Sequence, residues 1–124
     1  MNKPNTKKHI LIVNQSPPYS SSNAKESLDI ALAAGTFEQA VSVLFTGDAC
    51  YQLLPNQAPE AINSKNLCQM LKALPIYGID ELLVDEQSLA SRNVTHLDKS
   101  LTIRKISQHE VQELYRNSTA VFRF

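Results

Sequence analysis

Apolar positions along this chain follow two alternating periods. The continuous, β-branched runs at 9–14 and 41–45 are typical of strands that are buried on both faces. The run at 101–106 instead alternates apolar with polar side chains, which predicts a half-exposed strand. The predicted strands cover residues 9–14, 41–45 with an extension to Thr46 left open, 79–84, 101–106 and 119–124.

Segments with apolar residues at helical spacing separate these runs. Asn23 and Glu26 form a predicted capping box at the start of one helix, and Gly35 is expected to end that helix in a left-handed conformation. Further helices are predicted over 66–74, where Pro75 stops the helix, and from a second capping box at 107–110 through Tyr115, with a short helix or loop at 88–93.

The alternation of strands and helices predicts the fold class. Each connection is long enough for a crossover, so we expect an α/β protein with a mostly parallel, five-stranded sheet and helices on both faces. This is the three-layer arrangement of flavodoxin-like and Rossmann-like proteins. Residues 1–124 are expected to form a single domain in which residues 1–8 are a polar tail.

Composition narrows the range of partners. Twelve basic residues balance twelve acidic ones, so the chain lacks the positive charge that direct nucleic-acid binding requires. The apolar run at 10–13 is too short for a signal peptide or a membrane span, which makes a cytoplasmic location the expectation. Cys50 and Cys68 are 18 positions apart with no C-x-x-C motif, and this pattern fits neither a disulfide framework nor a metal site.

The segment 47–55 is the most informative part of the chain. It directly follows the predicted buried strand at 41–45, and function in open α/β sheets usually lies at that end of the strands. Cys50 would be a reactive thiol if a cation or a helix N-terminus lowered its pKa, but Asp48 would oppose thiolate formation. The commoner case is that Cys50 is a small apolar residue packed in the interior. Cys68 lies in the predicted helix at 66–74, next to its apolar stripe, and is expected to be part of the hydrophobic core.

The same segment also carries large apolar side chains. If these side chains are exposed, they would form the kind of patch that marks a subunit contact, and the aromatic residues at the C-terminus would add to it. The predicted interface residues are Asp48, Tyr51, Gln52, Leu53, Leu54, Phe122 and Phe124.

Three other groups of residues are weaker candidates for chemistry. The loop with Ser16 and the serines at 20–22 precedes a helix, where phosphates often bind, but it has no glycine and two prolines remove amide donors. The acidic pair 85–86 ends the third predicted strand, and solvation of a strand end is the commoner explanation for such a pair. His9, His96 and His109 are not placed beside a nucleophile, so we expect no catalytic residue among them.

Several blocks of residues resemble a known family. Residues 25–29, 43–45, 47–57 and 122–124 are similar to those of the TusC/DsrF proteins, which belong to the DsrE/DsrF/DsrH sulfur-relay family. The most specific blocks are 52–57 and 122–124, and the similarity runs from about His9 to Phe124. The resemblance implies a DsrE-like fold and a place in a heterohexamer, with two copies each of three related subunits (B-, C- and D-type).

The resemblance also implies a role in sulfur transfer. One branch of the family passes persulfide sulfur toward 2-thiouridine at the tRNA wobble base, and a downstream sulfur-carrier protein docks on the complex. The carrier cysteine of the D-type subunit lies at the end of the third strand, where this chain has Asp85 and Glu86 instead. A carboxylate cannot carry a persulfide, so the resemblance implies a non-catalytic, structural C-type subunit without a cofactor.

Three alternatives stay open at this point. The chain would be a DsrF-type subunit if it serves the dissimilatory sulfur-oxidation branch. It would be a persulfide carrier if Cys50 accepts sulfur, or a nucleotide- or flavin-binding module if the serine-rich loop at 16–22 binds phosphate.

Overall fold

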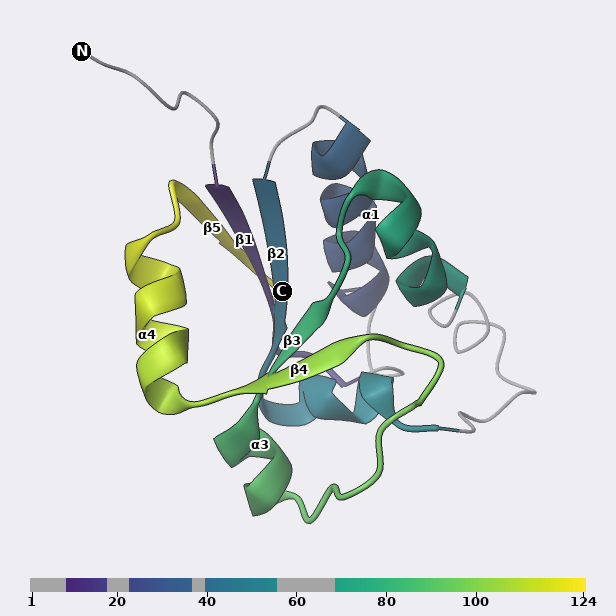
Figure 1. Cartoon of the computed structure of the whole chain (residues 1–124), viewed down its shortest axis with the longest axis vertical. Helices are drawn as coiled ribbons and strands as arrows, with labels where there is room; N and C mark the ends of the chain where they lie inside the picture. Colours follow the sequence, from purple (N-terminus) through teal and green to yellow (C-terminus); the bar gives the residue numbers. More distant parts are fainter. Residues whose placement is uncertain (1–8, 18–22, 37–39, 56–68) are drawn as a thin grey trace.

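The computed structural model describes residues 9–17, 23–36, 40–55 and 69–124, with the backbone alone at 23–25 and 35–36. Five strands form one sheet in the order β4-β3-β2-β1-β5, and every neighbouring pair is parallel. This arrangement confirms the predicted α/β fold (Figure 1). The strands are β1 (His9–Asn14), β2 (Ala40–Phe45), β3 (Leu82–Asp85), β4 (Ile103–Ile106) and β5 (Ala120–Arg123).

Helices cover the two faces of the sheet unequally. On one face lie α1 (Asn23–Thr36), a helical turn at 69–73 and the 3₁₀ helix η2 (Leu74–Tyr77). The other face carries α4 (Gln108–Arg116), which is drawn apart from the other helices in Figure 1. Two cores result, because side chains alternate between the faces along each strand. The larger core includes Ile12, Leu28, Val43 and Phe45, and the smaller includes Leu11, Leu44, Leu83 and Ile106.

The capping box at Ser107 is present as predicted. The Ser107 hydroxyl accepts from the Glu110 amide at 3.2 Å, and the Glu110 carboxylate accepts from the Ser107 amide at 3.0 Å. These two bonds satisfy amides that the first turn of a helix leaves free. They fix the point where the chain leaves β4 and turns onto the second face of the sheet.

Several predicted boundaries differ from the structure. Among them are the start of β4, which is Ile103 rather than Leu101, and the start of the short helix after β3, which is Glu86 rather than Ser88. Helix α1 continues through Thr36, so Gly35 lies inside it rather than ending it. The third strand begins at Leu82 rather than Ile79, because the Ile79 amide bonds to the Leu74 carbonyl at 3.1 Å and closes the end of η2. Of the predicted helix at 66–74, residues 66–68 lie outside the described residues.

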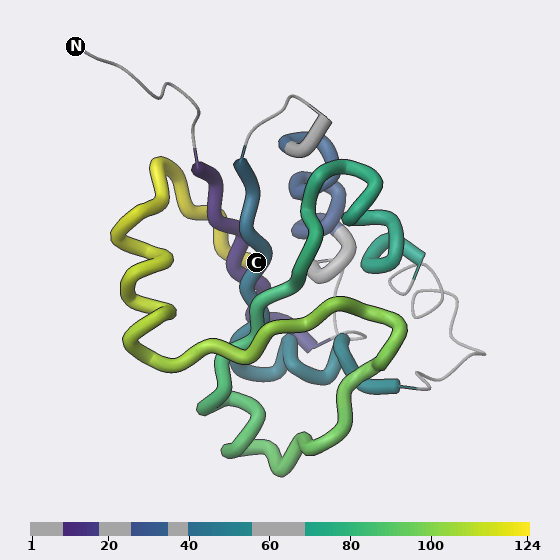
Figure 2. Tube along the Cα trace, in the orientation of Figure 1, coloured from purple at the N-terminus to yellow at the C-terminus, as the bar shows by residue number. Residues whose placement is uncertain are grey.

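Two further elements lie at the carboxyl ends of the strands. The 3₁₀ helix η1 (Gly47–Leu53) follows β2, and the short helix α3 (Glu86–Ser91) follows β3. After α3 the chain loops outward before it enters β4 (Figure 2). Along this loop the Asp98 amide donates to the Leu53 carbonyl at 2.8 Å, so the loop is held against the end of η1.

Candidate functional site at the carboxyl end of the sheet

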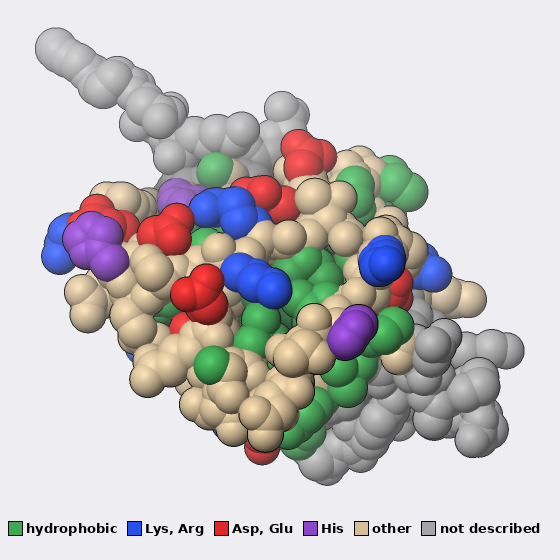
Figure 3. Space-filling view, turned by 60° about the horizontal axis from the view of Figure 1, so that its bottom comes forward, with side chains coloured by type: hydrophobic (Ala, Val, Ile, Leu, Met, Phe, Trp, Pro, Cys, Tyr) green, Lys and Arg blue, Asp and Glu red, His purple; other side chains and the backbone are tan. Residues whose placement is uncertain are grey.

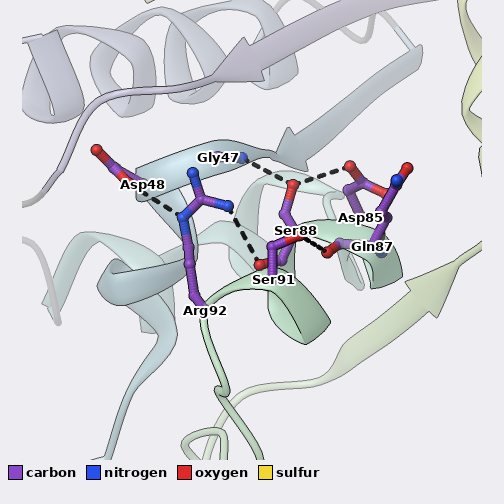
Figure 4. Close-up of polar contacts among 7 residues, drawn as sticks. All are labelled: Gly47, Asp48, Asp85, Gln87, Ser88, Ser91 and Arg92. Carbon is purple, nitrogen blue, oxygen red and sulfur yellow. Dashed lines mark hydrogen bonds and ion pairs between the residues drawn. The ribbon is translucent and has the colours of Figure 1, made fainter.

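Two loops meet at the carboxyl ends of β2 and β3 (Figure 4). Gly47 turns the chain out of β2 with a positive φ of 55°, a conformation that glycine adopts without strain. Its amide donates to the Ser88 hydroxyl on α3 at 2.9 Å, and that hydroxyl donates to the Asp85 carboxylate at 2.8 Å. We call Gly47, Asp48, Asp85, Ser88 and Arg92 the carboxyl-end corner.

Asp85 is the structural centre of this corner. Its side chain accepts from the Gln87 amide at 3.2 Å and so caps the start of α3, and it also accepts from the Gln108 side chain at 3.0 Å. With the Ser88 hydroxyl, three donors therefore surround a carboxylate that is almost fully buried. The strand-end acid is thus a buried hydrogen-bond acceptor, whereas the sequence favoured solvation.

Asp48 and Arg92 form the exposed part of the corner. The Arg92 guanidinium lies 3.0 Å from the Asp48 carboxylate and also donates to the Ser88 carbonyl at 3.3 Å. An exposed pair of this kind contributes little to stability. It does fix a cation and an anion at the surface, at the first turn of η1.

Cys50 lies beneath this surface in a poor environment for thiol chemistry. Its side chain is fully buried, and burial raises the pKa of the thiol from 9.0 to about 11. Arg92 lowers the pKa, but Asp85 and Asp48 oppose it. A persulfide carrier needs an accessible thiolate. In this conformation Cys50 offers neither access nor negative charge.

A buried polar network that the sequence did not predict lies under η1. The Gln52 amide nitrogen donates to the Asn14 side-chain oxygen at 3.1 Å and to the Ser16 carbonyl at 2.9 Å, and Asn14 donates to the Ser27 hydroxyl at 2.8 Å. All three side chains, those of Asn14, Ser27 and Gln52, are buried. The network joins the end of β1, helix α1 and η1. The sequence indicated this network only through polar residues at positions where an apolar residue is expected, such as Asn14 at the end of a buried strand.

The predicted interface residues of η1 divide by exposure. The side chains of Gln52 and Leu53 are buried within the chain, so they present no surface to a partner. They instead pack on the inner side of η1 and hold it against the rest of the domain. Asp48 is exposed, and Tyr51 and Leu54 are half-buried. The outer surface of η1 is therefore formed by Asp48, Tyr51 and Leu54.

Phe122 and Phe124, the two interface residues predicted at the C-terminus, lie at or near the carboxyl end of the sheet, where η1 also lies. The Gln15 amide donates to the Phe124 carbonyl at 2.8 Å, and the Phe124 amide donates to the Val13 carbonyl at 2.9 Å. Phe124 is half-buried, whereas Phe122 on the edge strand β5 is 44% exposed. β1 ends beside both β5 and the network under η1, so the structure brings the C-terminus and η1 to one end of the molecule.

The remaining candidate residues form no second centre among the described residues. His9 shares a 2.9 Å hydrogen bond with the Ser42 hydroxyl, and His96 shares one of 2.9 Å with Thr95. His109 is exposed on α4. In the described ranges, no group of three or more His, Cys, Asp or Glu side chains is arranged to hold a metal ion. The serines at 20–22 and Cys68 lie outside these ranges.

Figure 3 shows acidic and basic side chains interspersed over the face that it displays, rather than grouped by sign. Across the described part of the chain, no helix is long and apolar enough to cross a membrane.

The parallel sheet, its two helical layers and the corner at its carboxyl end define a three-layer α/β protein. The chain belongs to the DsrE/DsrF-like family, whose model matches residues 8–124. Its similarity to the crystal structure of the ychN protein from E. coli has a TM-score of 0.74 and covers 96% of this chain and 100% of that one. At 18% identity, this likeness shows the fold alone.

Curated relatives extend over most of the chain. The Protein TusC homolog of Pseudomonas aeruginosa is 36% identical over 105 residues, which cover 85% of this chain and 88% of that protein. Protein TusC of Buchnera aphidicola is 33% identical and covers 94% and 99%. The intracellular sulfur oxidation protein DsrF of Allochromatium vinosum is 30% identical and covers 94% and 96%. These relatives confirm the TusC/DsrF resemblance.

Proposed function

We propose that this chain is a non-catalytic, structural subunit of a cytoplasmic sulfur-relay complex that serves 2-thiolation of the tRNA wobble uridine. The observation that carries the proposal is the chemistry of the carboxyl-end corner. Asp85 ends β3 as a buried hydrogen-bond acceptor, and the nearby Cys50 thiol is buried with a pKa of about 11. Neither group suits transfer of a persulfide sulfur.

The proposed partners are related B-type and D-type subunits, on which a downstream sulfur-carrier protein would dock. The contact would use the outer surface of η1, formed by Asp48, Tyr51 and Leu54, together with Phe122 and Phe124 at the C-terminus. Exposure supports this choice, because Phe122 is a large aromatic residue that is 44% exposed on an edge strand. The carboxyl-end corner would then shape the complex around the sulfur-bearing cysteine of a partner.

A second branch of the family remains a candidate because of one specific relative. The DsrF protein is named for intracellular sulfur oxidation and covers nearly the whole chain. In that case the same structural role would serve a dissimilatory complex. Deletion of the gene separates the branches, because only the first predicts loss of 2-thiouridine from bulk tRNA.

Co-expression with the sister subunits of the same organism tests the structural role. We expect Tyr51→Ala and Leu54→Ala to reduce the amount of this chain that co-purifies with the sister subunits, while the matched variant Ile30→Ala on α1 co-purifies normally. Ile30 is a suitable control because it is an apolar residue, 37% exposed, on a helix outside the proposed contact. Normal assembly of both η1 variants would place the contact elsewhere.

A further inference from the structure

A groove lies beside α4 at the amino ends of the strands. It consists of two adjoining pockets of about 230 Å³ and about 410 Å³, which share Leu83, Arg104 and Leu114. Leu83 is almost fully buried, so the floor of the groove is apolar. We call the two pockets together the α4 groove, and the charged residues that line it are Asp80, Glu81, Arg104, Glu110 and Glu113.

The fold explains why this groove is open. The crossovers through α1 and through the helical turn at 69–73 both lie on the other face, so α4, with nine residues, covers this one. A single helix is about 10 Å wide, whereas five strands spaced about 4.8 Å apart form a much wider surface. The described part of the chain therefore leaves this face of β2 and β3 uncovered at Ser42 and Leu83, which line the larger pocket.

The α4 groove keeps a net negative charge after its ion pairs are counted. Arg104 lies 3.0 Å from Glu81 and 3.2 Å from Glu110. Glu113 is paired with Arg116, which lies at the end of α4. Four carboxylates are thus balanced by two guanidinium groups, and two negative charges stay unbalanced.

Asp80 is the groove carboxylate that lacks a counter-ion. Its side chain is exposed and has no ion-pair partner among the described residues. Lys72 lines a separate, smaller pocket with Asp80, but no ion pair joins the two. An additional cation in the α4 groove would therefore find a free carboxylate.

The chain enters β1 at the wall of this groove. His9, the first residue of β1, lines the smaller pocket, and its ring shares a 2.9 Å hydrogen bond with the Ser42 hydroxyl in the larger one. The His9 amide donates to the Thr119 hydroxyl at 3.3 Å, and the His9 carbonyl accepts from the Thr119 amide at 2.7 Å. Figure 1 shows the start of β1 beside the segment that leads from α4 to β5. The residues that precede His9 are therefore attached at the groove itself.

The residues that precede β1 carry the complementary charge. Residues 1–8 contain Lys3, Lys7 and Lys8 and no acidic residue. They lie outside the described residues, and the first seven also precede the part of the chain that the family model matches. Three positive charges are thus tethered beside a groove with two unbalanced negative charges. A short tether holds a segment at an effective concentration of about a millimolar, which favours binding within one chain.

We propose that residues 1–8 bind in the α4 groove of their own chain and cover the open face of β2 and β3. Lysine side chains fit this groove, because their methylene stems pack on an apolar floor while their ammonium groups reach the carboxylates at its rim. Because side chains alternate along a strand, an extended continuation of β1 directs Lys7 to the same face as His9.

The tail of the same chain is a better occupant than the alternatives. A second copy in a two-fold contact would place the acidic groove against its own equivalent, which like charges oppose. Nucleic acids and anionic membranes are also repelled by carboxylates. The proposal does not depend on the chain having sister subunits, so its failure would leave the proposed function untouched.

Paramagnetic NMR on the full-length chain tests this proposal. A nitroxide is attached at Asn2→Cys in a Cys68→Ser background, in which the remaining thiol, that of Cys50, is buried. We expect the label to broaden the amide signals of the α4 groove strongly and those of α1, on the other face, very little. Added NaCl at about 1 M, where the Debye length is about 3 Å, should remove most of the broadening in the groove.

Charge variants separate docking from mere proximity to His9. Changing Lys3, Lys7 and Lys8 together to Gln should reduce the broadening in the groove by about half or more, because the tail keeps its length but loses its charge. Asp80→Lys should act in the same direction. Lys105→Gln is the matched control and should change nothing, because Lys105 is an exposed residue of β4 whose side chain points to the other face.

Three results would overturn the proposal. The first is broadening that stays next to His9 and does not respond to loss of the lysines. The second is broadening of an isotope-labelled, unmodified chain by a spin-labelled second copy, because the tail would then occupy the groove of another molecule. The third is a groove whose amides respond to added sister subunits but not to the tail. Circular dichroism of each variant checks that the fold is intact.

Discussion

The backbone amide of Gly47 donates a 2.9 Å hydrogen bond to the hydroxyl of Ser88, 41 positions further along the chain. The same hydroxyl donates to Asp85 at 2.8 Å, so one oxygen atom serves as both acceptor and donor. The two loops that leave β2 and β3 are thereby joined, and the position of η1 depends on α3.

Ser88→Ala should therefore destabilise the protein. The substitution removes the acceptor of the Gly47 amide and one donor to the buried Asp85 carboxylate, and such losses cost about 1–3 kcal/mol of the free energy of unfolding. Urea denaturation measures the change. Ser91→Ala is the matched control, because its exposed hydroxyl donates only to the Gln87 carbonyl at 3.0 Å. Equal stability of the two variants would contradict the joining role of Ser88.

The Cys50 thiol should react slowly in the folded protein. A pKa raised from 9.0 to about 11 lowers the thiolate fraction at pH 8 by about a hundredfold, and burial reduces access further. Iodoacetamide labelling of a Cys68→Ser variant, followed by mass spectrometry, isolates Cys50. Labelling in the native state should be at least about a hundredfold slower than in urea. Comparable rates would show that Cys50 is accessible.

The same shift predicts how Cys50 affects stability with pH. Because folding raises its pKa, the folded state favours the protonated thiol, and this stabilisation is complete below pH 9 and is lost as the pH rises through about 11. Cys50→Ala should lack this component, so its free energy of unfolding should fall less over that interval than that of the Cys68→Ser variant. Parallel curves would contradict the assignment.

Gln52 and Asn14 should be energetically coupled. Gln52→Met removes the donor to the buried Asn14 side chain and to the Ser16 carbonyl, and we expect a loss of about 2 kcal/mol in the free energy of unfolding. Adding Asn14→Leu should cost less than the sum of the two single losses, because the first change has already broken the shared bond. Strict additivity in the double-mutant cycle would exclude the network as a unit.

The start of α4 offers a prediction from local sequence alone. Ser107→Ala removes the hydroxyl that accepts from the Glu110 amide and should cost about 1 kcal/mol of stability. The hydrogen bond from the Ser107 amide lowers the pKa of Glu110, so this part of the cap is present above the ordinary value of 4.5 and is lost as the pH falls. Thermal unfolding at pH 7 and pH 3 measures both. Wild type and variant should both lose the Glu110 contribution at pH 3, because the variant keeps the backbone amide at position 107, and the difference between them should persist.

These elements differ in how far the sequence predicts them. The strand at 9–14 and the capping box at Ser107 depend on neighbouring residues, and both match the structure. The bond between Gln52 and Asn14 joins residues 38 positions apart, which no local pattern reports. For the same reason the sequence left open whether the apolar side chains at 51–54 are exposed, and the fold buries Leu53 and leaves Ile76 exposed.

Sulfur transfer through a reconstituted complex tests the central claim, that this chain supports the relay without carrying sulfur. The complex would be assembled from the sister subunits with either the wild-type chain or the Cys50→Ala, Cys68→Ala variant, and loaded with a labelled persulfide donor. The account predicts equal rates of transfer to the acceptor with both chains, and no added sulfur on Cys50 of the wild type. A variant complex that assembles but transfers sulfur many times more slowly, together with a persulfide on Cys50 during turnover, would contradict it.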